Sequence, residues 1–103
     1  MDTKFIEVQD VYYDVAVSTD ELKRYAGGPI LRKLLDSIEA QDSGKSKVKI
    51  NLLGGHNENV AHTLRVLGAY GASYYPDFGS ALIFEKYRDS NNKKLIRVRI
   101  LIL

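Results

Sequence analysis

Apolar residues recur at helical spacing in two stretches of the chain, and each stretch predicts an amphipathic helix. The first stripe consists of Ile30, Leu31, Leu34, Leu35 and Ile38. We expect this helix to begin at Pro29 and to end before the polar loop that starts at Asp42. The second stripe consists of Val60, Ala61, Leu64 and Leu67. It predicts a helix from about Glu58 to Leu67, which Gly68 terminates.

The chain before Pro29 shows a less regular pattern. Residues Phe5 to Val17 mix aromatic and β-branched residues with acids, which favours an extended or irregular lead-in. Thr19 is expected to cap a short helix that carries two acids in its first turn. The Gly27-Gly28-Pro29 tripeptide is expected to interrupt that helix, because proline suits the first turn of a new one.

Three stretches predict strands. Residues Val48 to Leu53 predict a short buried strand that stops at Gly54. Ser80 to Tyr87 and Leu95 to Leu103 predict a C-terminal hairpin, joined by the polar turn Asp89 to Asn92. The last strand carries apolar residues on both faces, so we expect it to be covered on both sides near its end. The order of helix, strand, helix and hairpin predicts an α/β fold, with residues 1–103 forming one incomplete domain.

Composition narrows the class of protein. A chain of 103 residues with 45% hydrophobic and 27% charged residues is globular and can build one modest core. The formal charge of +2 and the lack of a basic, aromatic cluster argue against nucleic acid as a partner. Without cysteine, disulfides and thiolate metal sites are excluded. No apolar run reaches the ~20 residues of a membrane span, and no signal peptide is recognised.

The stretch with chemical potential is Gly54-Gly55-His56-Asn57-Glu58, where the predicted strand runs into a helix. Ligands of open α/β sheets bind beyond the carboxyl ends of strands, and a helix N-terminus favours an anion. His56 and Glu58 could therefore act on a phosphate there. A purely structural interpretation stays open: Asn57 caps the helix, Glu58 favours its first turn, and His56 is an ordinary turn residue.

Other polar and aromatic residues are expected to be structural. His62 is placed on the outer, solvated side of its helix. Arg65, Arg97 and Arg99 are expected to be ordinary surface charges rather than phosphate ligands. The tyrosines between Tyr70 and Tyr75 are expected to cover the hairpin rather than to line a substrate entrance. Two histidines without cysteine make a weak metal site, so no metal or other cofactor is implied.

Several motifs in order resemble the C-terminal segment of histidine acid phosphatases. They are Tyr25-Ala26-Gly27-Gly28-Pro29-Ile30-Leu31, then His56-Asn57-Glu58, then the loop and strand from Pro76 to Tyr87, and finally Ile96-Arg97-Val98-Arg99. Their order and spacing agree with that family from about residue 20 to residue 100. The resemblance implies a phosphomonoesterase that works through a phosphohistidine intermediate. It further implies that His56 binds the phosphoryl group and that an acid beside it protonates the leaving oxygen.

The chain also departs from the family pattern. The Arg-His-Gly signature that supplies the family's nucleophile has no counterpart here, so we expect this chain alone to be inactive. Asn57 stands where one branch has its acid, which leaves Glu58 as the donor at His-x-Glu spacing. Two other functions stay open: an inactive phosphatase-like binding protein, and an unrelated small α/β interaction module. The family suggests a secreted or lysosomal protein, whereas the missing cysteines and signal peptide leave the cytoplasm open. Unpaired strands predict self-association.

Overall fold

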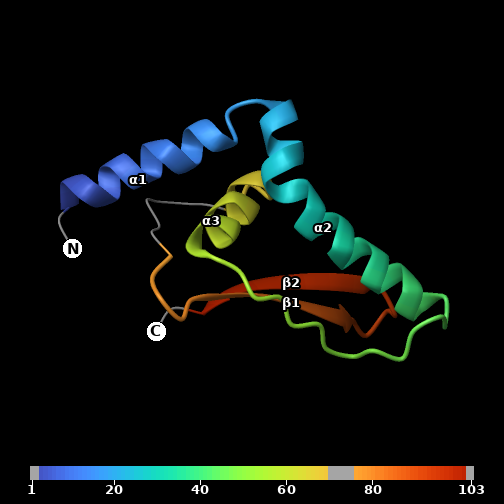
Figure 1. Cartoon of the computed structure of the whole chain (residues 1–103). Coiled ribbons are helices and arrows are strands. Elements are labelled where there is room, and N and C mark those ends of the chain that lie inside the picture. Colours follow the sequence, from blue (N-terminus) through green and yellow to red (C-terminus); the bar gives the residue numbers. More distant parts are fainter. Residues whose placement is uncertain (1–2, 70–75, 102–103) are drawn as a thin grey trace.

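The computed structural model describes residues 3–69 and 76–101. The elements in order are α1 (Thr3–Ala16), α2 (Asp20–Asp42), α3 (Asn57–Val66), β1 (Ala81–Arg88) and β2 (Lys94–Leu101). Figure 1 shows α3 in the angle between α1 and α2, with the β1–β2 hairpin beneath the helices. Three helices with one two-stranded antiparallel sheet form a partial α/β fold, as the sequence predicts.

The N-terminal prediction was wrong, because the expected irregular lead-in is the helix α1. Its inner side carries Asp10 and Tyr13, which are buried, and the buried Val17 follows directly after the helix. This spacing of three and four residues is helical. The pattern was obscured because one of the buried positions is an acid, which lies next to Arg65 of α3.

Helix α2 also differs from the prediction, because it continues through Gly27-Gly28-Pro29 without interruption. Proline removes one helical hydrogen bond, to the carbonyl four residues earlier. Both Pro29 and Tyr25, which carries that carbonyl, are exposed, so water can solvate the freed group. Gly27 is buried against α3, where an added Cβ would lie 2.8 Å from Cγ2 of Val66. The glycine thus permits close packing of α2 on α3.

The predicted helix boundaries are otherwise confirmed to within a residue or so. The hydroxyl of Thr19 accepts the N–H of Leu22 at 3.1 Å and caps α2, which ends at Asp42. Helix α3 begins at residue 57, and Gly68 follows it with a φ of 65°. A positive φ is the conformation that glycine adopts without strain.

The core lies where α3 packs between α1 and α2. Within the helices, the most buried side chains are Tyr13, Ala61, Leu64 and Thr63, each at most 1% exposed. Within residues 3–69 and 76–101, no helix has both the length and the apolar character to cross a bilayer.

The predicted buried strand from Val48 to Leu53 was wrong. This stretch is part of neither a helix nor a sheet, and the side chains of Val48, Ile50 and Leu52 are 53%, 76% and 90% exposed. A strand is stabilised by neighbours that pair with its backbone, and the described residues supply none for it.

The C-terminal hairpin is confirmed. β1 and β2 pair antiparallel, from Ala81 opposite Leu101 to Arg88 opposite Lys94. In the turn, Oδ1 of Asp89 accepts the N–H groups of Asn91 and Lys93 at 2.9 and 2.8 Å. However, every residue of β2 is exposed, so the expected cover on both sides was wrong. The tyrosines predicted to cover the hairpin fall in residues 70–75, outside the described residues.

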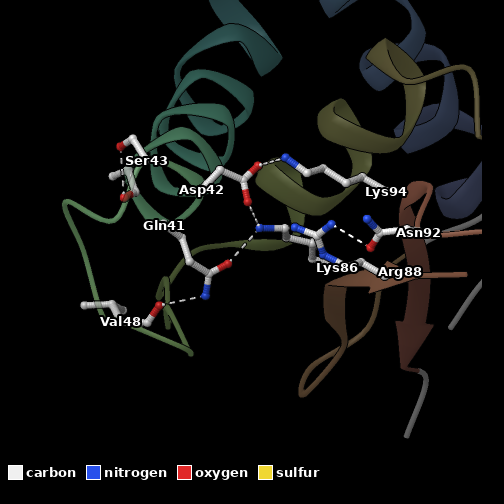
Figure 2. Close-up of polar contacts among 9 residues, drawn as sticks. Gln41, Asp42, Ser43, Val48, Lys86, Arg88, Asn92 and Lys94 are labelled. Atoms are coloured by element: carbon white, nitrogen blue, oxygen red, sulfur yellow. Dashed lines mark hydrogen bonds and ion pairs between the residues drawn. The ribbon is translucent and has the colours of Figure 1, made fainter.

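A polar cluster attaches the hairpin to the C-terminal end of α2 (Figure 2). The carboxylate of Asp42 pairs with Lys86 of β1 and with Lys94 of β2, the latter at 2.9 Å. The amide oxygen of Gln41 accepts from the same Lys86 ammonium at 3.0 Å. Hydrogen bonds from Lys86 and Lys94 lower the pKa of Asp42 to about 2. Because this contact is polar, it fixes the hairpin without covering the apolar side chains of β2.

Candidate functional site

His56 lies between the irregular residues that follow α2 and the first turn of α3. Its backbone occupies the N-cap position, with φ of −112° and ψ of 169°. The side chain of Asn59, one turn into the helix, accepts the N–H of His56 at 2.8 Å. The N–H of Asn59 in turn donates to the carbonyl of His56 at 3.0 Å. Both bonds use the backbone of His56, and the residue is exposed.

Gly55 has a steric reason to be glycine. A Cβ at this position would lie 3.0 Å from Oδ1 of Asn59, the atom that holds His56. At Gly54 an added Cβ would meet nothing within 4 Å. Only the second glycine of the pair is therefore needed for the Asn59 amide to reach His56.

The prediction that Asn57 caps the helix was wrong, because His56 is the N-cap and Asn57 is the first helical residue. The side-chain oxygen of Asn57 accepts the N–H of Glu58 at 2.9 Å. The helix begins one residue earlier than a cap at Asn57 would require, because Asn59 holds the backbone of the preceding histidine. Sequence reasoning missed Asn59. The signal was a polar acceptor three residues after the cap, the spacing of a capping box.

The arrangement presents three groups at one helix terminus. They are the imidazole of His56, the carboxyl group of Glu58, which is exposed, and the N-terminal end of α3. The N–H groups of Glu58 and Asn59 already donate to Asn57 and His56, and the helix dipole favours an anion at this end of α3. An imidazole can donate a hydrogen bond to a phosphoryl oxygen, and a carboxyl group can transfer a proton.

His62 is not on a solvated face, contrary to the prediction. Its ring meets the ring of Tyr13 edge to face, with centroids 5.8 Å apart, and its Nε2 is buried without a hydrogen-bond partner in the described part of the chain. Burial lowers the pKa of His62; the nearby Glu58 raises it and Arg65 lowers it, each to a smaller extent. A histidine with a buried nitrogen and a lowered pKa is a packing residue rather than part of the His56 site.

Arg65 is likewise not a surface charge. Its side chain is 4% exposed and lies 5.2 Å from the ring centroid of Tyr13. The guanidinium donates to Asp10 at 3.2 Å and to Asp14 at 2.7 Å, which joins α3 to α1. It does not belong to the His56 site.

The arginines of β2 are exposed, as expected. Arg99 pairs with Glu85 at 3.3 Å, and Arg97 lies over the ring of Tyr87. Among residues 3–69 and 76–101, no three metal-ligating side chains of the His, Cys, Asp or Glu type gather in one place.

Comparison with known proteins agrees with the resemblance in the sequence. The chain is 36% identical over 77 residues to venom acid phosphatase Acph-1 of Apis mellifera, a match that covers 71% of this chain and 19% of the relative. It is 28% identical over 99 residues to putative acid phosphatase 5 of Caenorhabditis elegans, which covers 91% of this chain and 23% of the relative. The chain thus spans about a quarter or less of these relatives' length. No solved structure matches it.

The family comparison covers nearly the whole chain. Residues 3–102 match the model of the histidine phosphatase superfamily (branch 2), which confirms the predicted family. The match includes α1, which lies before the first motif that carried the resemblance. This chain belongs to branch 2 of the histidine phosphatase superfamily.

Proposed function

We propose that residues 1–103 form an incomplete domain that supplies one side of the active site of a phosphomonoester-hydrolysing acid phosphatase. In this proposal His56 binds the phosphoryl group and Glu58 protonates the leaving oxygen. The observation that supports it is the geometry of one helix terminus. His56 is held there by Asn59 through two backbone hydrogen bonds, and the exposed Glu58 follows in the first turn.

In this proposal the chain supplies some of the catalytic groups, and residues outside it supply the others. A phosphohistidine mechanism needs a nucleophilic histidine with cationic groups on the phosphoryl oxygens. The chain holds only His56 and His62, and the latter is half-buried against Tyr13. The nucleophile is therefore assigned to residues outside this chain. His56 would donate a hydrogen bond to a phosphoryl oxygen as negative charge develops on it.

Glu58 is proposed as the proton donor because its neighbour Asn57 cannot donate a proton. As the nucleophile forms its bond to phosphorus, the bond to the ester oxygen breaks, and that oxygen takes a proton. An amide such as that of Asn57 has no proton to give at useful pH, and its oxygen is already bonded to the N–H of Glu58. A carboxyl group beside an anionic phosphate tends to stay protonated, as a donor must.

A second candidate function is an inactive relative that binds phosphate esters without hydrolysing them. Such a relative would keep the groups at the start of α3 and lack a nucleophile; the 103 residues themselves contain no Arg-His-Gly sequence. By itself the 103-residue chain should not turn over p-nitrophenyl phosphate. Turnover that survives rigorous purification would show that the nucleophile lies within this chain.

The roles of His56 and Glu58 can be tested in a chimera. This chain replaces the segment that it matches in the Apis mellifera venom acid phosphatase. Glu58→Gln should slow hydrolysis of glycerol 2-phosphate by roughly 10²- to 10⁴-fold, as loss of a general acid does. It should barely affect p-nitrophenyl phosphate, whose phenolate leaves without a proton. His56→Ala should slow both substrates.

Glu39→Gln is the matched control, because this glutamate is exposed and belongs to α2 rather than to the helix that begins after His56. It should leave both activities unchanged. An unchanged rate on glycerol 2-phosphate for Glu58→Gln would mean that the donor is another residue. An active chimera in which His56→Ala has no effect would remove His56 from the site.

A further inference from the structure

His56 directly follows two glycines, which by themselves do little to orient it. Glycine adopts backbone conformations that other residues avoid, so Gly54 and Gly55 leave the direction of the chain open. The side chain of His56 is exposed, so packing does not hold the imidazole in place. The rotamers open to a side chain depend on the φ and ψ of its own residue. The direction of the imidazole therefore depends on what fixes the backbone of His56.

Asn59 fixes this backbone at both of its polar groups. Oδ1 of Asn59 accepts the N–H of His56 at 2.8 Å, and the N–H of Asn59 donates to the carbonyl of His56 at 3.0 Å. Asn59 is itself connected to the core, because its carbonyl accepts the hydroxyl of Thr63 at 2.6 Å, and Thr63 is 1% exposed. A residue of the helix thus holds the residue that precedes the helix.

Gly55 leaves the space that the Asn59 side chain occupies. A Cβ at residue 55 would lie 3.0 Å from Oδ1 of Asn59 and 3.4 Å from its Cγ, so the amide would have to move away from His56. A Cβ on Gly54 would meet nothing within 4 Å. Gly55 and Asn59 therefore form one unit with the backbone of His56, and Gly54 does not belong to it.

We propose that Asn59 is a positioning residue for His56, and that residue 55 is glycine because this contact requires it. The inference rests on the proposed role of His56 in binding the phosphoryl group, and it adds two residues that act through His56. A hydrogen-bond donor that is already oriented in the free protein needs no reorganisation when charge develops on the phosphoryl oxygens. Loss of Asn59 should therefore resemble loss of His56 rather than loss of Glu58.

The chimera with the Apis mellifera venom acid phosphatase tests this role. Asn59→Ala should lower kcat about 10- to 100-fold on glycerol 2-phosphate and on p-nitrophenyl phosphate alike, because small displacements of a group near the reacting atoms have effects of up to about 10²-fold. Asn59→Gln should restore most of the rate, because glutamine at this position of a helix also reaches back to the N–H of the cap residue.

Asn57→Ala is the matched control for Asn59→Ala. It removes an asparagine of the same helical turn, but the side-chain oxygen of Asn57 is bonded to the N–H of Glu58 and not to His56. This variant should keep the rates of the unmodified chimera on both substrates. Urea midpoints of the Asn57→Ala and Asn59→Ala chimeras show whether a difference in rate arises from a difference in stability.

Double variants show whether Asn59 and Gly55 act as the inference requires. In the His56→Ala chimera, Asn59→Ala should cause no further loss, because the imidazole that it orients is gone. Gly55→Ala should slow both substrates by itself, but not when it is combined with Asn59→Ala, because no Oδ1 is then left to displace. Gly54→Ala should have no effect in either background. Gly55→Ala also makes the test if Asn59→Ala does not fold.

Amide hydrogen exchange in the 103-residue chain, followed by NMR, tests the contact without any measurement of activity. The His56 amide should exchange about 2- to 12-fold faster in Asn59→Ala than in the unmodified chain, as expected for loss of one hydrogen bond. Asn59→Gln should restore slow exchange. Asn57→Ala and Gly54→Ala should leave the His56 amide unchanged.

The outcomes separate this inference from the function on which it rests. An active chimera that His56→Ala does not affect would refute the proposed function and, with it, the positioning role. A chimera that requires His56 but tolerates Asn59→Ala would overturn the inference alone. So would effects of His56→Ala and Asn59→Ala that multiply in the double variant, because Asn59 would then act independently of His56.

Discussion

The two aspartates that hold Arg65 should differ sharply in their contribution to stability, although both lie on α1. Asp14 makes the shorter contact, at 2.7 Å, but its side chain is 63% exposed. Asp10 is 3.2 Å from the guanidinium, and its side chain is 13% exposed. The perturbation is alanine substitution of each. Alanine has the same helical propensity at both positions, so the difference between the variants reports the ion pairs.

Burial rather than distance decides the expected magnitude. An exposed ion pair contributes about 0–1 kcal/mol, because water and salt screen it. Removal of one partner of a buried pair costs about 3–5 kcal/mol, because the remaining charge stays buried without compensation. Arg65 would keep Asp14 and the carbonyl of Ala61, which accepts from it at 3.4 Å. We therefore expect about 3 kcal/mol for Asp10→Ala and less than about 1 kcal/mol for Asp14→Ala.

Urea unfolding followed by far-UV circular dichroism measures both values. Protein concentration must be fixed and low, because self-association would add to the apparent stability. As a check, the Asp10→Ala/Arg65→Met double variant should be more stable than Asp10→Ala alone, since it also removes the buried guanidinium that has lost its buried carboxylate. If Asp14→Ala costs as much as Asp10→Ala, contact distance outweighs burial and the reasoning is refuted.

Three further predictions concern packing and pH. Gly27→Ala should lower the free energy of unfolding by about 1–3 kcal/mol, because the new methyl group overlaps Val66; an unchanged urea midpoint would contradict the close packing. The pKa of Asp42, about 2 in the folded chain against its ordinary 3.8, predicts stability that is present above about pH 4 and lost as the pH falls through 2. Asp42→Asn should remove this acid-dependent loss in unfolding measured from about pH 5 to 2, and an unaltered pH profile would contradict it. His62 has a pKa below its ordinary 6.5. Its contribution to the free energy of unfolding should therefore be fully present above pH 6.5 and should decline as the pH falls below that value. His62→Phe should flatten that decline, and a variant with the same slope would place its origin elsewhere.

Local sequence signals predicted the elements whose causes are local. The helices that the two apolar stripes predict, the cap at Thr19, the stop at Gly68 and the polar turn from Asp89 were all confirmed. So was the family, because its motifs occur in order along the sequence. The position of His56 at the start of a helix followed from the same local pattern. Its catalytic role and that of Glu58 stay predictions, because they depend on groups outside this chain.

Tertiary contacts explain the residues whose burial the sequence did not predict. Arg65 resembles a surface charge in sequence, yet it is buried because Asp10 of α1 compensates its charge. Gly27 looks like a helix breaker, yet it lies within α2 because α3 needs the space that a side chain would fill. His62 is polar, yet it packs on Tyr13.

The stretch from Val48 to Leu53 shows the same limit from the opposite direction. Its apolar residues predict a buried strand, yet the structure places it in neither a helix nor a sheet. Burial and pairing, however, are not properties of one segment, because each strand hydrogen bond needs a partner from elsewhere. The sequence alone determined the apolar character of this stretch. The tertiary structure decided that no described part of the chain pairs with it, so Ile50 and Leu52 stay exposed.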